Sequence, residues 1–203
     1  MYVPRHFAMD KLDEQHALIE AHDFAVLVVS GPDGLFATHV PMMLKRDEGK
    51  FGTLYAHLAR TNPQASMLGR DMLAVFSGPH GYISPSWYSD RAKNVPTWNY
   101  SAVHCYGVAH AIAGETLPLL SDMTAIYEKE RANGWRADEL TADIRESLPR
   151  GVVGLRMEIT RIEGKAKLSQ NKPRAERERL IDGLKAAGDT TLAAVMEHQL
   201  NLI

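Results

Sequence analysis

Residues 57–63, His-Leu-Ala-Arg-Thr-Asn-Pro, carry side chains that can bind a phosphate. They end an expected strand and precede a short helix expected to begin near Pro63. Arg60 offers a guanidinium that can hold an oxyanion through two hydrogen bonds, and a helix start exposes backbone N–H groups. The same residues also fit a structural role, in which Asn62 caps the helix, Pro63 takes its first position and Arg60 is solvated. Residue type alone leaves both interpretations open.

A second segment, residues 78–88 together with residues 95–100, is rich in aromatic residues and proline. We expect it to form loops beyond a strand end, where Tyr82, Tyr88 and Trp98 can wall a planar ligand. Asn99 would then fix the polar edge of that ligand. Aromatic side chains that only cover the mouth of a barrel explain the pattern equally well.

A third segment, residues 163–174, is basic. From Lys165 to Arg179 there are six basic and two acidic side chains, which gives this stretch a local charge of +4. A solvated strand-to-helix connection accounts for it, and so does attraction of a phosphate, a flavin edge or a nucleic acid backbone. If the protein binds DNA directly, this stretch is predicted to make the contact.

Common catalytic signatures are absent from the sequence. There is no G-x-S-x-G, H-E-x-x-H, Walker or G-x-G-x-x-G motif, and no side chain is an evident general base. His104 and His110 lie at even spacing in an expected strand, but ordinary hydrogen-bonded histidines are favoured over a metal site. The single cysteine, Cys105, is expected to be buried and inert. We therefore assign no catalytic residue and no metal ligand.

Several short strands are expected in the first half of the chain. Residues 25–30 and 35–44 flank a Gly-Pro-Asp-Gly turn and read as a hairpin, with Pro41 marking a bulge or an edge. The further strands are expected at residues 50–59, 72–77, 82–84 and 102–112. Closely spaced strands joined by turns favour an antiparallel barrel or sandwich.

Helices are expected at both ends of the chain. Residues 10–22 read as an N-capped amphipathic helix, and residues 116–131 and 137–148 have helical spacing. Residues 151–162 return to a strand, and one or two helices follow Pro173, the last one at residues 190–202. We expect one domain over residues 1–203, mainly β, with an N-terminal helix and C-terminal helical additions.

Composition narrows the classes of function. The chain has 203 residues, 45% of them apolar, and a formal net charge of −2, so no global positive field is available to hold nucleic acid. One cysteine cannot form an intramolecular disulfide and suits a reducing compartment. With no long apolar run, the protein is expected to be cytoplasmic, with no membrane partner.

Taken together and in this order, the three segments resemble the PaiB family of FMN-binding negative transcriptional regulators. The N-terminal Met-Tyr-Val-Pro-Arg-His-Phe fits as well, so the resemblance spans essentially the whole chain. Two positions depart from the family pattern: Ala56 stands where glycine is usual, and Ala166 where an aromatic residue is usual between two lysines. The second departure affects the ligand wall more than the fold.

The resemblance implies a six-stranded antiparallel FMN-binding split barrel that works as a homodimer with flavin between subunits. By analogy with relatives, Arg60 and Asn62 would bind the phosphate, Thr38 and His39 would lie near the flavin ring, and residues 167–171 would close the site from the partner chain. The residues expected to bind the cofactor are Thr38, His39, His57, Arg60, Asn62, Trp98, Asn99, Lys167, Ser169, Gln170 and Asn171.

Two functions follow from the resemblance, and a third is weaker. The first is a dimeric FMN-binding repressor of transcription, although no helix-turn-helix signature is present and DNA contact can be direct or indirect. The alternative is an FMN-dependent oxidoreductase, like a flavin reductase or a pyridoxamine phosphate oxidase, using NAD(P)H or another small molecule. The third is a haem-binding or haem-degrading split barrel with a histidine as axial ligand.

Overall fold

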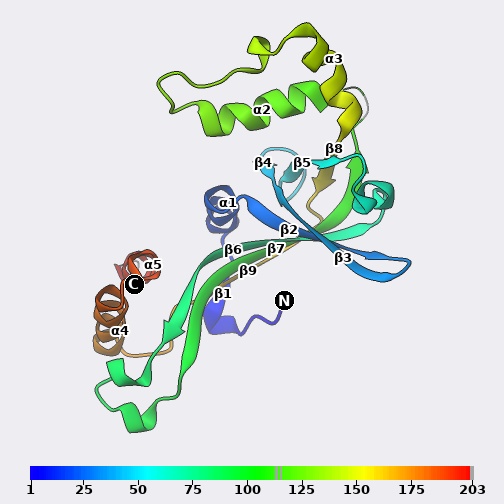
Figure 1. Ribbon diagram of the computed structural model, residues 1–203. Coiled ribbons are helices and arrows are strands. Elements are labelled where there is room, and N and C mark those ends of the chain that lie inside the picture. Colours follow the sequence, from blue (N-terminus) through cyan, green and yellow to red (C-terminus); the bar gives the residue numbers. More distant parts are fainter. Residues whose placement is uncertain (113, 115, 202–203) are drawn as a thin grey trace. The chain divides into compact units, whose positions relative to one another are not determined.

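The computed structural model describes residues 1–112, 114 and 116–201 (Figure 1), and the chain forms two compact units. Unit 1 consists of Met1–Ala21, Ser77–Val103 and Glu163–Ile203, and unit 2 consists of His22–Phe76 and His104–Ile162. Strands β6 (Asp71–Ile83) and β7 (Thr97–Ala111) each contribute residues to both units.

The described residues form nine strands and five α-helices, which confirms the expected mainly β fold with added helices. Hydrogen-bonded neighbours follow the order β3-β2-β6-β7-β8-β5-β4, while β9 pairs with β7 and β1. The expected number of strands, six, is wrong. Short extra strands explain part of the difference, because the expected strand at residues 35–44 is divided at Met42, whose N–H donates to the carbonyl of Asp23 at 2.9 Å.

A hairpin opens unit 2, as its sequence predicts. Strand β2 (Phe24–Gly31) pairs antiparallel with β3 (Gly34–Pro41), with Val28 opposite Ala37. Gly34 has φ +111°, a backbone conformation that residues with a side chain rarely adopt. Alternate residues of β2 are buried, which gives the hairpin one face toward the core.

The other elements of unit 2 surround the same core. They are β4 (Met43–Lys45), β5 (Thr53–Ala59), the 3-10 helix η2 (Pro63–Met67), α2 (Thr116–Glu128), η5 (Ala137–Glu139), α3 (Ala142–Gly151) and β8 (Val152–Glu158). Strand β5 pairs antiparallel with β8 over its whole length. Leu54 and Leu58 of β5 and Leu155 and Met157 of β8 are buried, so this strand pair forms the centre of the unit 2 core.

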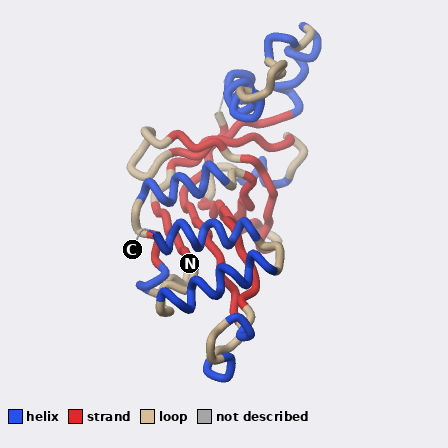
Figure 2. Tube along the Cα trace, turned by 90° about the vertical axis from the view of Figure 1, so that its left-hand side faces the viewer, coloured by secondary structure: helices blue, strands red, loops and turns tan. Residues whose placement is uncertain are grey.

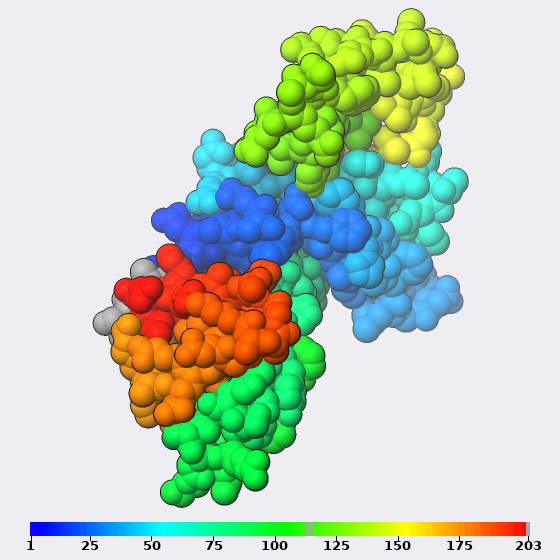
Figure 3. All heavy atoms as spheres, turned by 60° about the vertical axis from the view of Figure 1, so that its left-hand side comes forward, coloured from blue at the N-terminus to red at the C-terminus, as the bar shows by residue number. Residues whose placement is uncertain are grey.

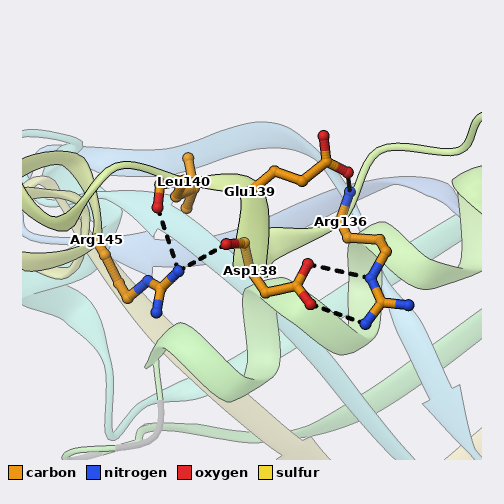
Figure 4. A network of polar contacts seen from close by, with 5 residues as sticks. All are labelled: Arg136, Asp138, Glu139, Leu140 and Arg145. Atoms are coloured by element: carbon orange, nitrogen blue, oxygen red, sulfur yellow. Dashed lines mark hydrogen bonds and ion pairs between the residues drawn. The ribbon is translucent and has the colours of Figure 1, made fainter.

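Helices α2 and α3 lie side by side in unit 2 (Figure 1). The connection between them is held by a polar network around Asp138 (Figure 4). The Arg136 guanidinium donates to both carboxylate oxygens of Asp138, at 3.1 and 2.8 Å, and Arg145 donates to the carbonyls of Asp138 and Leu140. These side chains are exposed, so the network orders the connection more than it stabilises the fold.

Three helices cover one face of the unit 1 strands (Figure 2). They are α1 (Leu12–Ala21), α4 (Arg174–Ala186) and α5 (Thr190–Asn201). Helices α4 and α5, orange and red in Figure 3, pack side by side, with Leu180, Leu184, Leu192 and Met196 buried between them and the strands. No helix of the described residues is both long and apolar enough to cross a membrane.

The remaining elements of unit 1 are short apart from β9. They are η1 (Arg5–Phe7), β1 (Ala8–Met9), η3 (Pro85–Trp87), η4 (Arg91–Lys93) and β9 (Arg161–Lys167), whose first two residues belong to unit 2. Helices α4 and α5 are separated at Gly188, which has φ +85°, as the sequence predicts. The expected end of the last helix at residue 202 lies outside the described residues.

The prediction of loops at residues 78–81 and 97–100 is wrong, because β6 and β7 run straight through these positions, whereas the strand expected at residues 82–84 is confirmed up to Ile83. Gly78 and Gly81 lie in β6 and permit close packing. A Cβ on Gly78 would lie 2.3 Å from Ser101 Oγ, and one on Gly81 would lie 2.4 Å from Asp189 Oδ2. These glycines are therefore required by neighbours far along the chain and do not mark a turn.

Candidate functional site

The eleven residues that the sequence analysis selected fall into two groups. Thr38, His39, His57, Arg60 and Asn62 belong to unit 2, and Trp98, Asn99, Lys167, Ser169, Gln170 and Asn171 belong to unit 1.

In unit 2, Asn62 joins two elements. Its side-chain oxygen accepts from the backbone N–H of Gln64 at 2.9 Å, so Asn62 caps η2 with Pro63 in the first turn. Its side-chain nitrogen donates to Thr38 Oγ1 at 3.0 Å. The structure thus brings together the end of β5, the start of η2 and the middle of β3.

Arg60 holds the C-terminal end of α3. Its Nε donates to the carbonyl of Arg150 at 2.9 Å, and its Nη2 donates to the carbonyls of Val152 and Pro149 at 2.8 and 3.3 Å. A cation is favoured there because the carbonyls of a helix end are partially negative. These bonds use the Nε–Nη2 edge of the guanidinium, and no described residue accepts from Nη1.

The two histidines of this group differ in environment. His57 lies in β5, half-buried, and burial lowers its pKa. Its Nδ1 is buried and has no hydrogen-bond partner among the described residues. His39 is exposed and stacks on Phe24, with ring centroids 6.0 Å apart. Because successive residues of a strand face opposite sides, His39 and Thr38 point away from each other.

In unit 1, Asn99 is part of the core. Its side chain is fully buried and donates to Ser169 Oγ at 2.9 Å and to Met196 Sδ at 3.4 Å. Ser169 is the single non-glycine residue with positive φ, +63°, in the described chain. The bond between Asn99 and Ser169 therefore fixes a strained turn between β9 and α4.

The other residues of this group have separate contacts. Lys167 Nζ donates to Thr97 Oγ1 and to the carbonyl of Trp98. Gln170 bonds to its own loop, accepting from the N–H of Leu168 at 2.7 Å and donating to the carbonyl of Ala166 at 2.5 Å. Trp98 is 55% exposed, and its ring lies beside Tyr82 and His80, on the strand face opposite Asn99.

Four residues of this group line one cavity of about 300 Å³, which we call the unit 1 cavity. Asn99, Lys167, Ser169 and Asn171 lie in its wall. The other residues of the wall are Phe7, Tyr88, Lys93, Asn94, Val95, Thr97 and Lys172. Gln170 and Trp98 are not part of it.

The basic stretch of residues 165–179 is not a uniform exposed surface. Lys165 is 6% exposed and donates to the carbonyl of Tyr2, and Arg177 is 4% exposed and bonds to Gln199. Arg174 pairs with Glu178 at 3.0 Å. Fewer cations are thus available to a phosphate backbone than the sequence count indicates.

Two residues of the unit 1 cavity lie outside every segment that the sequence analysis selected. Lys93 and Asn94 belong to a turn that Asp90 caps by accepting from the N–H of Ala92. The Asp-x-Ala-Lys-Asn spacing is the local signal for that turn. Nothing in the sequence indicates that the turn faces residues 167–172.

Comparison with solved structures identifies the fold. Over 81% of this chain and 72% of the other, the structure is similar to the flavocytochrome Anf3 from Azotobacter vinelandii, with a TM-score of 0.60 and 17% identity. It is also similar to the FAD and heme binding protein from Mycobacterium smegmatis, with a TM-score of 0.59 and 16% identity, over 82% of this chain and 76% of that one. The expected split-barrel fold is confirmed.

The chain belongs to the FMN_bind_2 family, described as "Putative FMN-binding domain", whose model matches residues 1–161. It is 35% identical over 207 aligned residues to "Protease synthase and sporulation protein PAI 2" of Bacillus subtilis, and the alignment covers 98% of each chain. The resemblance to the PaiB family is therefore confirmed.

Proposed function

We propose that the protein binds FMN and acts as a cytoplasmic, homodimeric regulator of transcription of the PaiB type. The observation that carries the proposal is the family match over residues 1–161, which includes all five candidate residues of unit 2. The name of the Bacillus subtilis relative, which links it to protease synthesis and sporulation, supports a regulatory role.

Two features of unit 2 support a site for a flavin mononucleotide. Arg60 lines a cavity of about 370 Å³, and no residue that the structure describes accepts from its Nη1, so this nitrogen could donate to a phosphate oxygen. The Nδ1 of His57 is buried and has no hydrogen-bond partner among the described residues. A buried polar atom without a partner is unfavourable by about 1–3 kcal/mol, so a ligand that reaches it removes this penalty.

Arg60, Asn62, Thr38 and His57 are the residues that we expect to hold the flavin, which supplies electron-transfer chemistry when bound. Roles for His39 and Trp98 at the ring, and closure of the site by residues 167–171 of a partner chain, stay predictions. Because Asn62 bonds both to Thr38 Oγ1 and to the N–H of Gln64, this residue positions Thr38 as well as the start of η2.

The variant Asn62→Asp tests the proposed phosphate position. Aspartate caps a helix as well as asparagine does, so the variant is expected to fold and to keep its melting temperature. Its negative charge should repel the phosphate and weaken FMN binding about tenfold or more, as measured by quenching of flavin fluorescence. Riboflavin, which lacks the phosphate, serves as the control ligand. Equal FMN affinity in the two proteins would move the phosphate elsewhere.

The regulatory role is tested with promoter fragments. If residues 165–179 contact DNA, affinity should fall steeply between about 50 and about 200 mM salt, because bound counterions are released. Absent or salt-independent binding contradicts direct contact.

Steady oxidation of NAD(P)H after addition of FMN would favour the oxidoreductase alternative over a regulator. A Soret band on titration with haem, lost on substitution of one histidine, would favour the haem alternative.

A further inference from the structure

The charge in the wall of the unit 1 cavity is unbalanced. Three lysines, Lys93, Lys167 and Lys172, line it, and no aspartate or glutamate does among the described residues. Two carboxylates lie close to the wall: Asp90 pairs with Lys93 at 3.0 Å, and Glu176 accepts from Ser89 while the charge of Lys172 helps to lower its pKa. The positive charge of the wall that no described carboxylate pairs within 4.0 Å is therefore that of Lys167 and Lys172, with Glu176 offsetting part of the charge of Lys172.

Both of these ammonium groups bond to neutral acceptors in the described chain. Lys167 donates to a threonine hydroxyl and a backbone carbonyl, and Lys172 donates to Asn94 Oδ1 at 2.7 Å. Burial and the charge of Lys165 lower the pKa of Lys167. An anion in the cavity would oppose that effect, because an opposite charge favours the protonated form.

The other walls are apolar or carry neutral polar groups. Phe7 and Tyr88 are each 7% exposed, and the ring of Tyr88 lies 5.1 Å from Lys172 Nζ. Asn99 and Ser169 provide a fixed floor, since they bond to each other across the turn that follows β9. A volume of about 300 Å³ is at the lower end of ligand pockets and suits a small molecule.

We propose that the unit 1 cavity binds a small aromatic acid, whose oxyanion lies between Lys167 and Lys172 and whose ring packs against Phe7 and Tyr88. The oxyanion can be a carboxylate or a phosphate ester, since both accept charge-assisted hydrogen bonds from ammonium groups. All of these residues belong to unit 1. The proposal does not rest on the flavin site proposed for unit 2.

Isothermal titration calorimetry of the full chain with benzoate and with phenyl phosphate tests the proposal and separates the two sources of the oxyanion. At least one of them should bind with one site per chain, and benzamide, which has the shape of benzoate without its charge, should not. Lys167→Met and Lys172→Met should each weaken binding about tenfold, since methionine keeps an unbranched apolar side chain but lacks the ammonium. Lys11→Met is the matched control, because Lys11 is an exposed lysine of the same unit that pairs with Glu14.

The outcomes separate this site from the flavin site. Binding that persists in the presence of saturating FMN, with unchanged FMN affinity in Lys172→Met, supports a separate site. Competition between FMN and the aromatic acid would overturn the proposal, because the cavity would then belong to the flavin. Absence of heat with both acids, or binding of benzamide as tight as that of benzoate, would overturn it as well. Failure of FMN to bind leaves these measurements and their interpretation intact.

Discussion

Asn62 and Arg60 show how far residue type can be interpreted without a structure. The Asn-Pro pair predicts a helix cap, and the observed cap of η2 agrees with that interpretation. The bond from Asn62 to Thr38 and the bonds from Arg60 to carbonyls at residues 149–152 were not predictable. These bonds join residues that are 24 and about 90 positions apart in the sequence. A local sequence pattern cannot predict contacts over such separations.

Two substitutions of Asn62 separate the loss of its capping bond from the introduction of a charge. Asn62→Ala removes the acceptor for the Gln64 N–H and the donor to Thr38, so the free energy of unfolding should fall by about 1–2 kcal/mol. Asn62→Asp keeps an acceptor at the cap and should remain within about 0.5 kcal/mol of the wild type. Urea unfolding followed by circular dichroism measures both. Equal loss in the two variants would contradict the capping role.

Cys105 should be unreactive in the folded protein. It is fully buried in β7, and burial raises the pKa of its thiol, so the reactive thiolate is disfavoured. We expect no labelling by iodoacetamide at pH about 8 in the native state, and complete labelling in denaturant, both measured by mass spectrometry. Fast labelling of the native chain would contradict the burial of this strand.

At the scale of elements, local signals predicted the hairpin and the helices, but not the long strands. The Gly-Pro-Asp-Gly turn and the Gly188 break each act within a few residues, so the sequence records them. Gly78 and Gly81 resemble turn residues by composition, yet they serve contacts with Ser101 and Asp189. Proline and glycine therefore predicted loops where β6 and β7 continue.

The variant Gly78→Ala tests this explanation. The new Cβ would meet Ser101 Oγ, and the overpacking should lower the free energy of unfolding by about 1–3 kcal/mol. Gly151→Ala is the control, because a Cβ there meets nothing within 4 Å. It should change stability by less than about 1 kcal/mol. Thermal or urea unfolding that leaves Gly78→Ala unchanged would show that Gly78 is not needed for packing.

At the scale of the whole molecule, the units are not consecutive in sequence. Each contains parts of β6 and β7, so neither can lose these strands without affecting the other. We therefore keep the prediction of a single domain over residues 1–203, which implies that the two units unfold together. The sequence offers no linker at which the two units would separate.

Calorimetry should show this cooperativity directly. We expect one heat-absorption peak on thermal unfolding, with equal calorimetric and van't Hoff enthalpies, because the two units share three strands, β6, β7 and β9. Two resolved transitions, or a van't Hoff enthalpy well below the calorimetric value, would show that the units unfold independently.

Flavin binding by the purified chain is the central claim. Equilibrium dialysis with FMN measures it most directly, since it gives both affinity and stoichiometry. We expect saturation at one FMN for each chain, with riboflavin bound more weakly because it lacks the phosphate that Arg60 is proposed to hold. Retention of neither flavin at any protein concentration tested would contradict the account.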